Sequence, residues 1–337
     1  MRAPDFWQKR DVWARLLAPL GALYGFSVAI KARLANPFDP GIPVICVGNL
    51  TAGGSGKTPI ALAITEMLRA KGHKPYFLTR GYGGSERGPA LATRGHSVEV
   101  MGDEALLLAR AAPTIVARDR GAGARLAKEK GATVLVMDDG HQNFALRKSL
   151  SLVVVDAQTG FGNGFQIPAG PLREPVAQGL ARADAVMLVG SEHSEDGRAA
   201  VHSDSVWTAQ GNGAPGLGGF RGPVLRAHLV SDGSAFTGQP VFAFAGIGRP
   251  EKFIASLEAC GAHVIGSCFF ADHHPYSEDE ILELKAVAGE AALVTTEKDF
   301  VRLSIASREG IKVLKVSARF DDAAAIERLL DSALSRP

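Results

Sequence analysis

The sequence predicts an α/β fold, with a mostly parallel sheet covered by helices and a second, smaller α/β unit after it. Short apolar segments alternate with helix-forming segments from residue 43 to about residue 190, which is typical of parallel strands joined by helices. The first apolar segment runs into a glycine-rich turn at 51–58, and a helix-forming stretch follows that turn. A glycine-rich, polar stretch at 211–222 separates this half from a second alternation of the same kind.

In the first half, strands are identified as short apolar runs and helices as longer stretches of helix formers. The strands are expected at Pro43–Val47, Pro75–Thr79, Thr114–Ala117, Val134–Met137, Leu152–Val155 and Ala185–Val189. The helices are expected at Lys57–Lys71, Asp103–Ala111 and Asp119–Lys130. Parallel sheets bind ligands beyond the carboxyl ends of their strands, so the residues that follow each strand are the candidates for chemistry.

The second half repeats this order on a smaller scale. Its strands are expected at Pro240–Ala245, His263–Phe270, Ala292–Thr295 and Val313–Val316, and its helices at Pro250–Cys260, Ser277–Ala288 and Ala323–Leu334. We therefore predict three parts of the chain. They are an N-terminal membrane-associated helix at 1–35, a core domain at 36–215 and a smaller C-terminal α/β domain at 216–337.

The N-terminal segment predicts a helix that lies on a membrane surface. Leu16 to Ile30 is uncharged and largely apolar, but these fifteen residues fall short of the roughly 20 that a spanning helix needs. Aromatic and aliphatic side chains between Phe6 and Phe26 would enter the lipid interface, and basic residues at both ends would meet anionic headgroups. The basic residues are Arg2, Lys9, Arg10, Arg15, Lys31 and Arg33. The alternative is a helix packed on the protein's own core.

Charge and cysteine content narrow the class of protein. A net charge of +2 argues against a general nucleic-acid binder, and no nucleic-acid partner is expected. The cysteines, Cys46, Cys260 and Cys268, lack the spacing of metal ligands and suit a reducing compartment. No obligate protein partner is indicated.

The segment 44–58 has the pattern of a phosphate-binding P-loop, which places the fold with the P-loop nucleoside triphosphatases. Backbone N–H groups of such a loop and the positive end of the next helix bind phosphate. Lys57 would reach the β- and γ-phosphates, and the Thr58 hydroxyl would ligate Mg²⁺. The expected nucleotide contacts are Thr51, Ala52, Gly53, Gly54, Ser55, Gly56, Lys57 and Thr58. Thr51 stands where the usual pattern has a glycine, and a plain glycine-rich turn with a solvated lysine is the alternative.

Two carboxylates, Asp138 and Asp139, follow the apolar strand expected at 134–137. In a P-loop protein an acid at this position holds the Mg²⁺ that bridges the β- and γ-phosphates. Because neighbouring side chains diverge on an extended chain, one acid could ligate the metal directly and the other through water. Solvated acids at a strand end are the alternative.

Three further segments carry residues that could act near a nucleotide. Asp103 opens a helix, where capping is the simpler role. The sequence 272–274, Asp-His-His, follows an expected strand and could be an acid–base pair, a metal site or a chance neighbourhood. In the proline-bracketed segment 168–175, Arg173 could neutralise phosphoryl charge and Glu174 could ligate Mg²⁺, although a surface turn is equally consistent with it.

Two segments have weaker patterns. The loop Arg80–Gly84 offers a basic and an aromatic residue to a sugar or a phosphate, or it is an ordinary loop. The segment Thr296–Asp299 has the residues of a guanine-reading motif in a different order, and it therefore favours GTP only weakly.

Together these motifs resemble the tetraacyldisaccharide 4′-kinases, the LpxK family, over nearly the whole chain. The resemblance is carried by segments 47–59, 79–83, 102–104, 138–142, 168–174, 272–274 and 296–299. The family's own loop also has Thr at the position of Thr51. The resemblance implies an ATP- and Mg²⁺-dependent kinase that moves the γ-phosphoryl group to the 4′-hydroxyl of tetraacyldisaccharide 1-phosphate, giving lipid IVA in lipid A biosynthesis.

The resemblance also implies a location and roles for residues. The enzyme would work at the cytoplasmic face of the Gram-negative inner membrane, held peripherally or monotopically by its N-terminal helix. Asp103 would be the base on the 4′-hydroxyl with His273 as its partner, and Lys57 and Arg173 would contact the transferred phosphate. The implied Mg²⁺ ligands are Thr58, Asp138, Asp139 and Glu174.

Two other functions fit the P-loop alone. One is a GTPase or ATPase switch protein of the metallochaperone type, which would hydrolyse nucleotide under the control of a protein partner and without lipid. The apolar N-terminal segment counts against it. The other is a kinase for a soluble sugar or nucleoside, which leaves that segment without a role.

Overall fold

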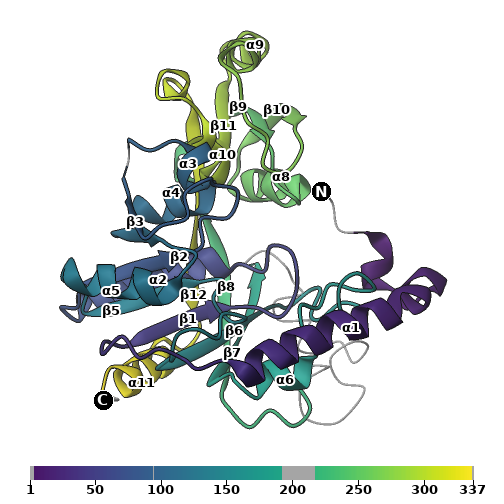
Figure 1. Ribbon diagram of the computed structural model, residues 1–337. Helices are drawn as coiled ribbons and strands as arrows, with labels where there is room; N and C mark the ends of the chain where they lie inside the picture. The colour runs from purple at the N-terminus through teal and green to yellow at the C-terminus, as the bar shows by residue number, and fades with distance from the viewer. Residues whose placement is uncertain (1–3, 94, 192–216, 336–337) are drawn as a thin grey trace.

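The computed structural model describes residues 4–93, 95–191 and 217–335, and it has the predicted α/β fold (Figure 1). Within these residues twelve strands form one sheet, in the order β10-β9-β11-β12-β8-β7-β6-β1-β5-β2-β4-β3. The strands β9, β10 and β11 lie in the upper part of Figure 1, and β1, β2 and β5 lie below them.

The first half of the chain forms the parallel part of the sheet. Its strands are β1 (Val44–Gly48), β2 (Pro75–Thr79), β3 (Ala90–Ala92), β4 (Thr114–Val116), β5 (Val134–Asp138), β6 (Leu150–Asp156) and β7 (Ala185–Ser191). All of these pairs are parallel except β3 with β4, at the outer edge. The carboxyl ends of β1, β5, β2 and β4 therefore lie next to one another in that order, where a ligand of a parallel sheet binds.

The second half continues the same sheet through one long strand. Its strands are β8 (Val224–Asp232), β9 (Pro240–Ala245), β10 (His263–Phe269), β11 (Ala292–Thr296) and β12 (Lys312–Phe320). The start of β12 pairs parallel with β11, and the remainder pairs antiparallel with β8. Because β8 in turn pairs with β7, backbone hydrogen bonds tie the second half to the first.

Alternating side chains of the central strands account for helices on both faces of the sheet. Ile45 and Val47 of β1 pack with α2 (Lys57–Ala70) and α11 (Ala323–Leu334). Cys46, between them, packs with α5 (Arg120–Glu129) on the other face. The other helices described are α3 (Val98–Met101), α4 (Asp103–Ala109), α6 (Val176–Leu180), α8 (Pro250–Ala259), α9 (Glu278–Ala288) and α10 (Glu297–Arg302), with 3₁₀ turns η1 (Asp5–Gln8), η2 (Ser234–Phe236) and η3 (Ala306–Arg308).

The N-terminal helix α1 spans Val12–Leu34, longer at both ends than the apolar run from which it was expected. By length and composition it could cross a membrane, and in Figure 1 it lies along the outside of the first half of the chain. Gly21 and Gly25 let it pack closely against Gln166 and Pro175. Its large exposed apolar side chains are Val12, Trp13, Leu16, Leu20, Leu23, Tyr24, Phe26, Ile30 and Leu34.

The predicted strands and helices begin and end within two residues of the observed ones, except for both ends of α1 and the end of β12. There the exposed Lys315, Ser317 and Arg319 alternate with partly buried residues up to Phe320, a pattern typical of a half-buried strand. The sequence analysis did not identify β3, β8, α3, α6 or α10. Arg2, residues 211–216 of the glycine-rich stretch and the predicted domain boundary between 215 and 216 lie outside the described residues or at their edge. The division into domains therefore stays a prediction.

Candidate active site

The P-loop follows β1, as its pattern predicts. Gly56, with φ 79°, caps α2, and Lys57 is the first residue of that helix. Inside the loop Asn49 Nδ2 donates to Ser55 Oγ at 3.0 Å, and Ala52 N donates to Pro171 O at 2.7 Å. The loop is therefore fixed at its base by its own side chains and at its side by the segment that carries Arg173.

Thr58 and Asp138 lie together at the ends of α2 and β5. Thr58 Oγ1 donates to Asp138 Oδ2 at 2.9 Å, while the buried Asp138 Oδ1 has no hydrogen-bond partner among the described residues. Burial raises the pKa of Asp138 to about 6, with the nearby Glu104 adding to the effect and Lys57 opposing it. A buried carboxylate oxygen that accepts no hydrogen bond is unfavourable in an apolar site, and a bound cation would stabilise it.

Asp139 holds two cations instead. Arg173 Nη1 donates to its two oxygens at 2.8 and 2.9 Å, and Lys57 Nζ lies 3.7 Å from Oδ1. Burial opposes ionisation of Asp139, but these two cations outweigh it and lower its pKa. Asp139 has φ 56°, a conformation that non-glycine residues rarely adopt and that occurs often at functional sites.

Glu174, one residue after Arg173, is buried and bonds to Gln142 and Arg182. Its Oε1 accepts from Gln142 Nε2 at 2.9 Å, and its Oε2 accepts from Arg182 Nη2 at 2.5 Å. Gln142 also donates to Asn49 O, at the start of the P-loop. Its role as an Mg²⁺ ligand stays a prediction. Among the residues described, no three His, Cys, Asp or Glu side chains gather as a metal site on their own.

Asp103 and His273 are 170 residues apart in the sequence and form one unit in space. His273 Nδ1 and Asp103 Oδ2 are 2.8 Å apart, and Arg302 Nε and Nη2 donate to the same oxygen at 3.0 and 2.5 Å. The Asp103 side chain is 3 % exposed and that of His273 is 45 % exposed, so the imidazole is the accessible member. His274 turns elsewhere, to Glu280 Oε1 at 3.0 Å.

The environment shifts the pKa values of Asp103 and His273 in opposite directions. Burial acts to raise the pKa of Asp103, but the bonds from His273 and Arg302 outweigh it and hold that pKa far below its usual range. The hydrogen bond with Asp103 raises the pKa of His273, and the Asp272 carboxylate adds to this effect. His273 also has φ 62°. Asp139 and His273 are thus the non-glycine residues with positive φ among those described, and both belong to this site.

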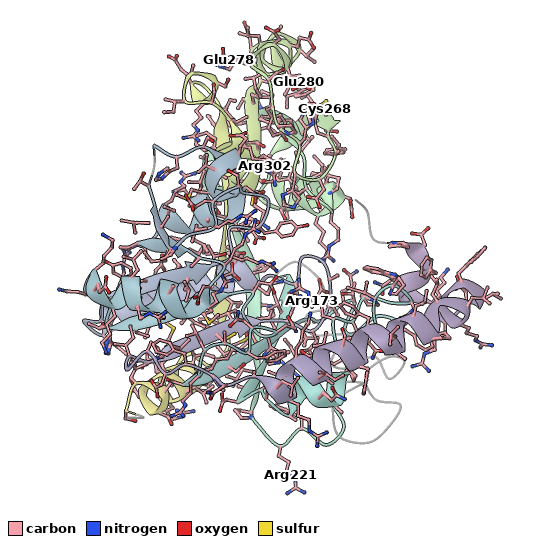
Figure 2. All side chains as sticks on the ribbon, viewed as in Figure 1. Arg173, Arg221, Cys268, Glu278, Glu280 and Arg302 are labelled. Carbon is pink, nitrogen blue, oxygen red and sulfur yellow. The ribbon has the colours of Figure 1, made fainter. Side chains whose placement is uncertain are left out.

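Arg302 was not identified from the sequence. It is held by Asp299 of the segment 296–299, which resembles a guanine-reading motif in a different order. Asp299 is fully buried and its Oδ1 accepts from Arg302 Nη1 at 2.9 Å and from Gly246 N at 2.9 Å. Lys298 Nζ lies 3.3 Å from Glu104 Oε1. The segment 296–299 therefore supports the Asp103 unit from the second half of the chain. Figure 2 labels Arg302 in the upper part of the molecule and Arg173 below it, near the middle.

A second contact between the halves was also missed, at the P-loop itself. Arg249, which precedes α8, donates through Nη2 to Gly54 O and to Asp156 Oδ2, the latter at 3.0 Å. Lys252 Nζ lies 3.6 Å from the same Asp156 oxygen. Arg249 follows a Gly-Ile-Gly stretch, and an isolated arginine in such a loop carries no pattern that a sequence reading could use.

Comparison with known proteins assigns the chain to a family. The sequence profile of the family described as LpxK, tetraacyldisaccharide-1-P 4′-kinase, matches residues 13–335. The chain belongs to the LpxK family. The tetraacyldisaccharide 4′-kinase of Paramagnetospirillum magneticum is 49% identical over 336 residues, covering 98% of each chain. That of Rhodospirillum rubrum is 48% identical over 338 residues, covering 98% of this chain and 97% of the relative.

A solved structure agrees on the fold. The crystal structure of LpxK from Aquifex aeolicus in complex with ATP superposes with a TM-score of 0.74, at 24% identity, covering 95% of this chain and 99% of that one. The predicted P-loop kinase fold is thereby confirmed. Membership of the family makes the enzyme a tetraacyldisaccharide 4′-kinase of lipid A biosynthesis, and the switch protein and the soluble-sugar kinase are set aside.

Proposed function

We propose that this LpxK-family enzyme transfers the γ-phosphoryl group of ATP to the 4′-hydroxyl of tetraacyldisaccharide 1-phosphate, using residues 51–58 for the nucleotide and the Asp103–His273 pair for the hydroxyl. The observation that carries the proposal is the convergence of two motifs from distant parts of the chain, since the second half brings His273 to within 2.8 Å of Asp103. A switch protein that only hydrolyses nucleotide has no need for such a pair.

The donor side of the site fits ATP with Mg²⁺. Thr58 and Asp138 would hold the metal, because the free Asp138 Oδ1 and the Thr58 hydroxyl are hard oxygen ligands beside the P-loop. When bound, Mg²⁺ would neutralise charge on the β- and γ-phosphates. Lys57 and Arg173 would contact the phosphates from the positions in which Asp139 holds them. These contacts support charge neutralisation rather than a covalent intermediate.

The acceptor side fits an acid–base pair that acts as a unit. The resemblance implies Asp103 as the base with His273 as its partner, and we propose the reverse order on the burial and pKa of the pair. The exposed imidazole of His273 would accept the hydroxyl proton at Nε2, while Asp103, fixed by Arg302, keeps Nδ1 protonated and stabilises the imidazolium. The low pKa of Asp103 favours this order, because a carboxylate that stays ionised is a weak proton acceptor and a good partner for a cation. The proton then leaves through solvent as the product departs.

A pH profile should report His273. If neutral imidazole is the active form, kcat/KM falls at acid pH as His273 becomes protonated. Because Asp103 raises the pKa of His273, this fall should begin at a higher pH than for an ordinary histidine. In Asp272→Asn one of the charges that raise this pKa is gone, so the acid limb should move to lower pH. Glu280 binds His274 and not His273, so Glu280→Gln should leave the acid limb of the pH profile unchanged. An unmoved limb in Asp272→Asn would separate His273 from the proton transfer.

We further propose that α1 holds the enzyme at the cytoplasmic face of the inner membrane, where the acyl chains of its substrate lie. The exposed apolar side chains of α1 support this, since they would otherwise face water. The turn η1, which precedes α1, is also tied to the active-site segment 163–175. Trp7 Nε1 donates to Pro168 O at 3.0 Å, and Asn163 Nδ2 donates to Phe6 O at 2.9 Å.

Replacement of Leu16, Leu20 and Leu23 by serine should reduce transfer to micellar lipid by roughly tenfold and abolish binding to vesicles. The three side chains are exposed, so thermal stability and ATP affinity should not change. Removal of residues 1–30 should reduce transfer further, because it also deletes the contacts with segment 163–175. Full activity of the triple variant on lipid would show that α1 is not a membrane anchor.

The deciding experiment measures label transfer from γ-labelled ATP to purified tetraacyldisaccharide 1-phosphate in detergent micelles. We expect labelled lipid, with no transfer when the lipid is omitted. Nucleotide hydrolysis without lipid phosphorylation, from a folded protein that binds ATP, would contradict the proposed acceptor.

A further inference from the structure

We propose that Lys298 is a further catalytic residue, whose ammonium group donates a hydrogen bond to the transferred phosphoryl group from the second half of the chain. Lys298 belongs to the segment 296–299, whose order of residues favours guanine binding only weakly. The structure brings this lysine to the acceptor side of the site. The inference rests on the proposed function, because it adds a residue to the same phosphoryl transfer.

Two side chains of the short helix α10 reach two neighbouring acids of α4. Lys298 and Arg302 are four residues apart on α10, so they lie on the same face of that helix. Arg302 donates to Asp103 Oδ2, and Lys298 Nζ lies 3.3 Å from Oε1 of Glu104, the next residue along α4. The two helices lie side by side in Figure 1, where Val301 packs against the apolar side of α4. Both helices therefore fix the position of Lys298 relative to Asp103.

Lys298 has hydrogen-bond donors to spare, whereas every nitrogen of Arg302 is already engaged. Arg302 is 3% exposed, and each of its three nitrogens donates to Asp103, to Asp299 or to a backbone carbonyl. The Lys298 side chain is 37% exposed, and among the described residues Glu104 is the group that accepts from its Nζ. An ammonium group carries three N–H donors, so Lys298 can bind an oxygen that enters the site while it keeps its bond with Glu104.

The carboxylates around Lys298 place it between the acid–base pair and the predicted metal site. Burial alone would lower the pKa of Lys298, but the carboxylates of Glu104, Asp103 and Asp138 outweigh burial and raise that pKa. The ammonium group therefore stays charged at neutral pH. Glu104 also helps to raise the pKa of Asp138, so the acids of α4 and the end of β5 act on one another across the same space. A phosphoryl group that moves from the nucleotide to the acceptor crosses this space.

An ammonium group here would complete charge neutralisation from the acceptor side. Lys57 and Arg173 approach the phosphates from the P-loop side, where Asp139 holds both of them. During transfer the bond from the γ-phosphorus to the bridging oxygen of ADP breaks and a bond to the 4′-oxygen forms, while the hydroxyl proton passes to His273. Lys298 keeps its own protons and donates to a phosphoryl oxygen, where the charge of the transition state develops.

Lys298→Met removes the ammonium group and keeps a side chain of similar length. We expect kcat for transfer to lipid to fall by about 10²–10³-fold. The Kd for ADP and Tm should change little, because the ion pair with Glu104 is partly exposed. Lys298→Arg keeps a cation and should recover part of the rate. Lys312→Met, which removes an exposed lysine from the start of β12, should retain the wild-type kcat. A wild-type kcat in folded Lys298→Met would overturn the proposal.

A purely structural role predicts a different pattern. If Lys298 only ties α10 to α4, its loss should disturb Arg302 and Asp103, and the acid limb of the pH profile that reports His273 should shift. If Lys298 contacts the phosphoryl group, kcat falls at every pH and that limb stays where it is in the wild type. A shifted limb together with a lowered Tm would assign Lys298 to the support of Asp103 and would contradict a contact with phosphate.

A binding measurement separates this inference from the proposed function. With Mg²⁺ and a non-hydrolysable β,γ-imido analogue of ATP, and without lipid, the ³¹P resonance of the bound γ-phosphorus should differ between the wild type and Lys298→Met. The α-phosphorus resonance should not change, and Lys312→Met should reproduce the wild-type spectrum. A shifted γ resonance would support the contact even if another molecule were the true acceptor. An unchanged γ resonance of the bound analogue would show that Lys298 does not reach the phosphoryl group.

Discussion

Replacing Asp103 by alanine is expected to slow phosphoryl transfer by about 10²–10⁴-fold while ATP binding survives. The carboxylate accepts bonds from His273 and from two nitrogens of Arg302 on a single oxygen. Without it His273 loses the bond that orients its ring and raises its pKa, so the imidazole is both misplaced and a weaker base. The P-loop is on a different element and keeps its own contacts.

The measurement needs three readouts on the same protein: the rate of transfer to lipid, the Kd for ATP, and Tm. Arg302 is 3% exposed, so Asp103→Ala leaves this buried cation with Asp299 as its remaining carboxylate partner and should lower Tm. Asp103→Asn keeps the shape of the side chain and should preserve more stability than activity. Glu280→Gln is the control, because Glu280 pairs with His274, the neighbour of His273, instead. Lost ATP binding in a folded Asp103→Asn variant would make Asp103 a structural residue.

The first half of this site could be predicted because its signals are local. The P-loop and the acids at 138–139 each occupy a few consecutive residues beside an apolar strand, and the rule that parallel sheets bind ligands at their carboxyl edge then joins them. The expected fold followed from the alternation of short apolar runs and helix formers. The strand pairing in the structure agrees with this expected fold.

The remainder of the site depends on contacts between distant segments. Asp103 reads as a helix cap in the sequence, and only its bond with His273, from the other half of the chain, distinguishes it from any other acid at the start of a helix. Arg302 and Arg249 stand in segments without a pattern, and their importance comes from the charge that each one meets. Which member of the Asp103–His273 pair faces solvent is likewise decided by burial, which depends on the packing of α4 against α10.

Lys57→Ala is expected to reduce kcat/KM by about 10²–10³-fold or more, through both weaker ATP binding and slower transfer. Lys57 is the first residue of α2 and its side chain is 11% exposed, with Nζ 3.7 Å from Asp139. Arg173 contacts both oxygens of the same carboxylate. Each cation is thus already aligned before the nucleotide arrives, and removing one leaves the other to neutralise the phosphate charge alone.

Lys71→Ala is the matched control for this experiment. Lys71 lies at the other end of α2 and pairs with Asp331 at the surface, so its loss removes the same charge from the same helix without touching the P-loop. Label transfer to lipid should persist in Lys71→Ala and be absent or barely detectable in Lys57→Ala. If Lys57→Ala transferred phosphate at the wild-type rate, the glycine-rich loop would be a structural turn, and the nucleotide would have to bind elsewhere along the sheet edge.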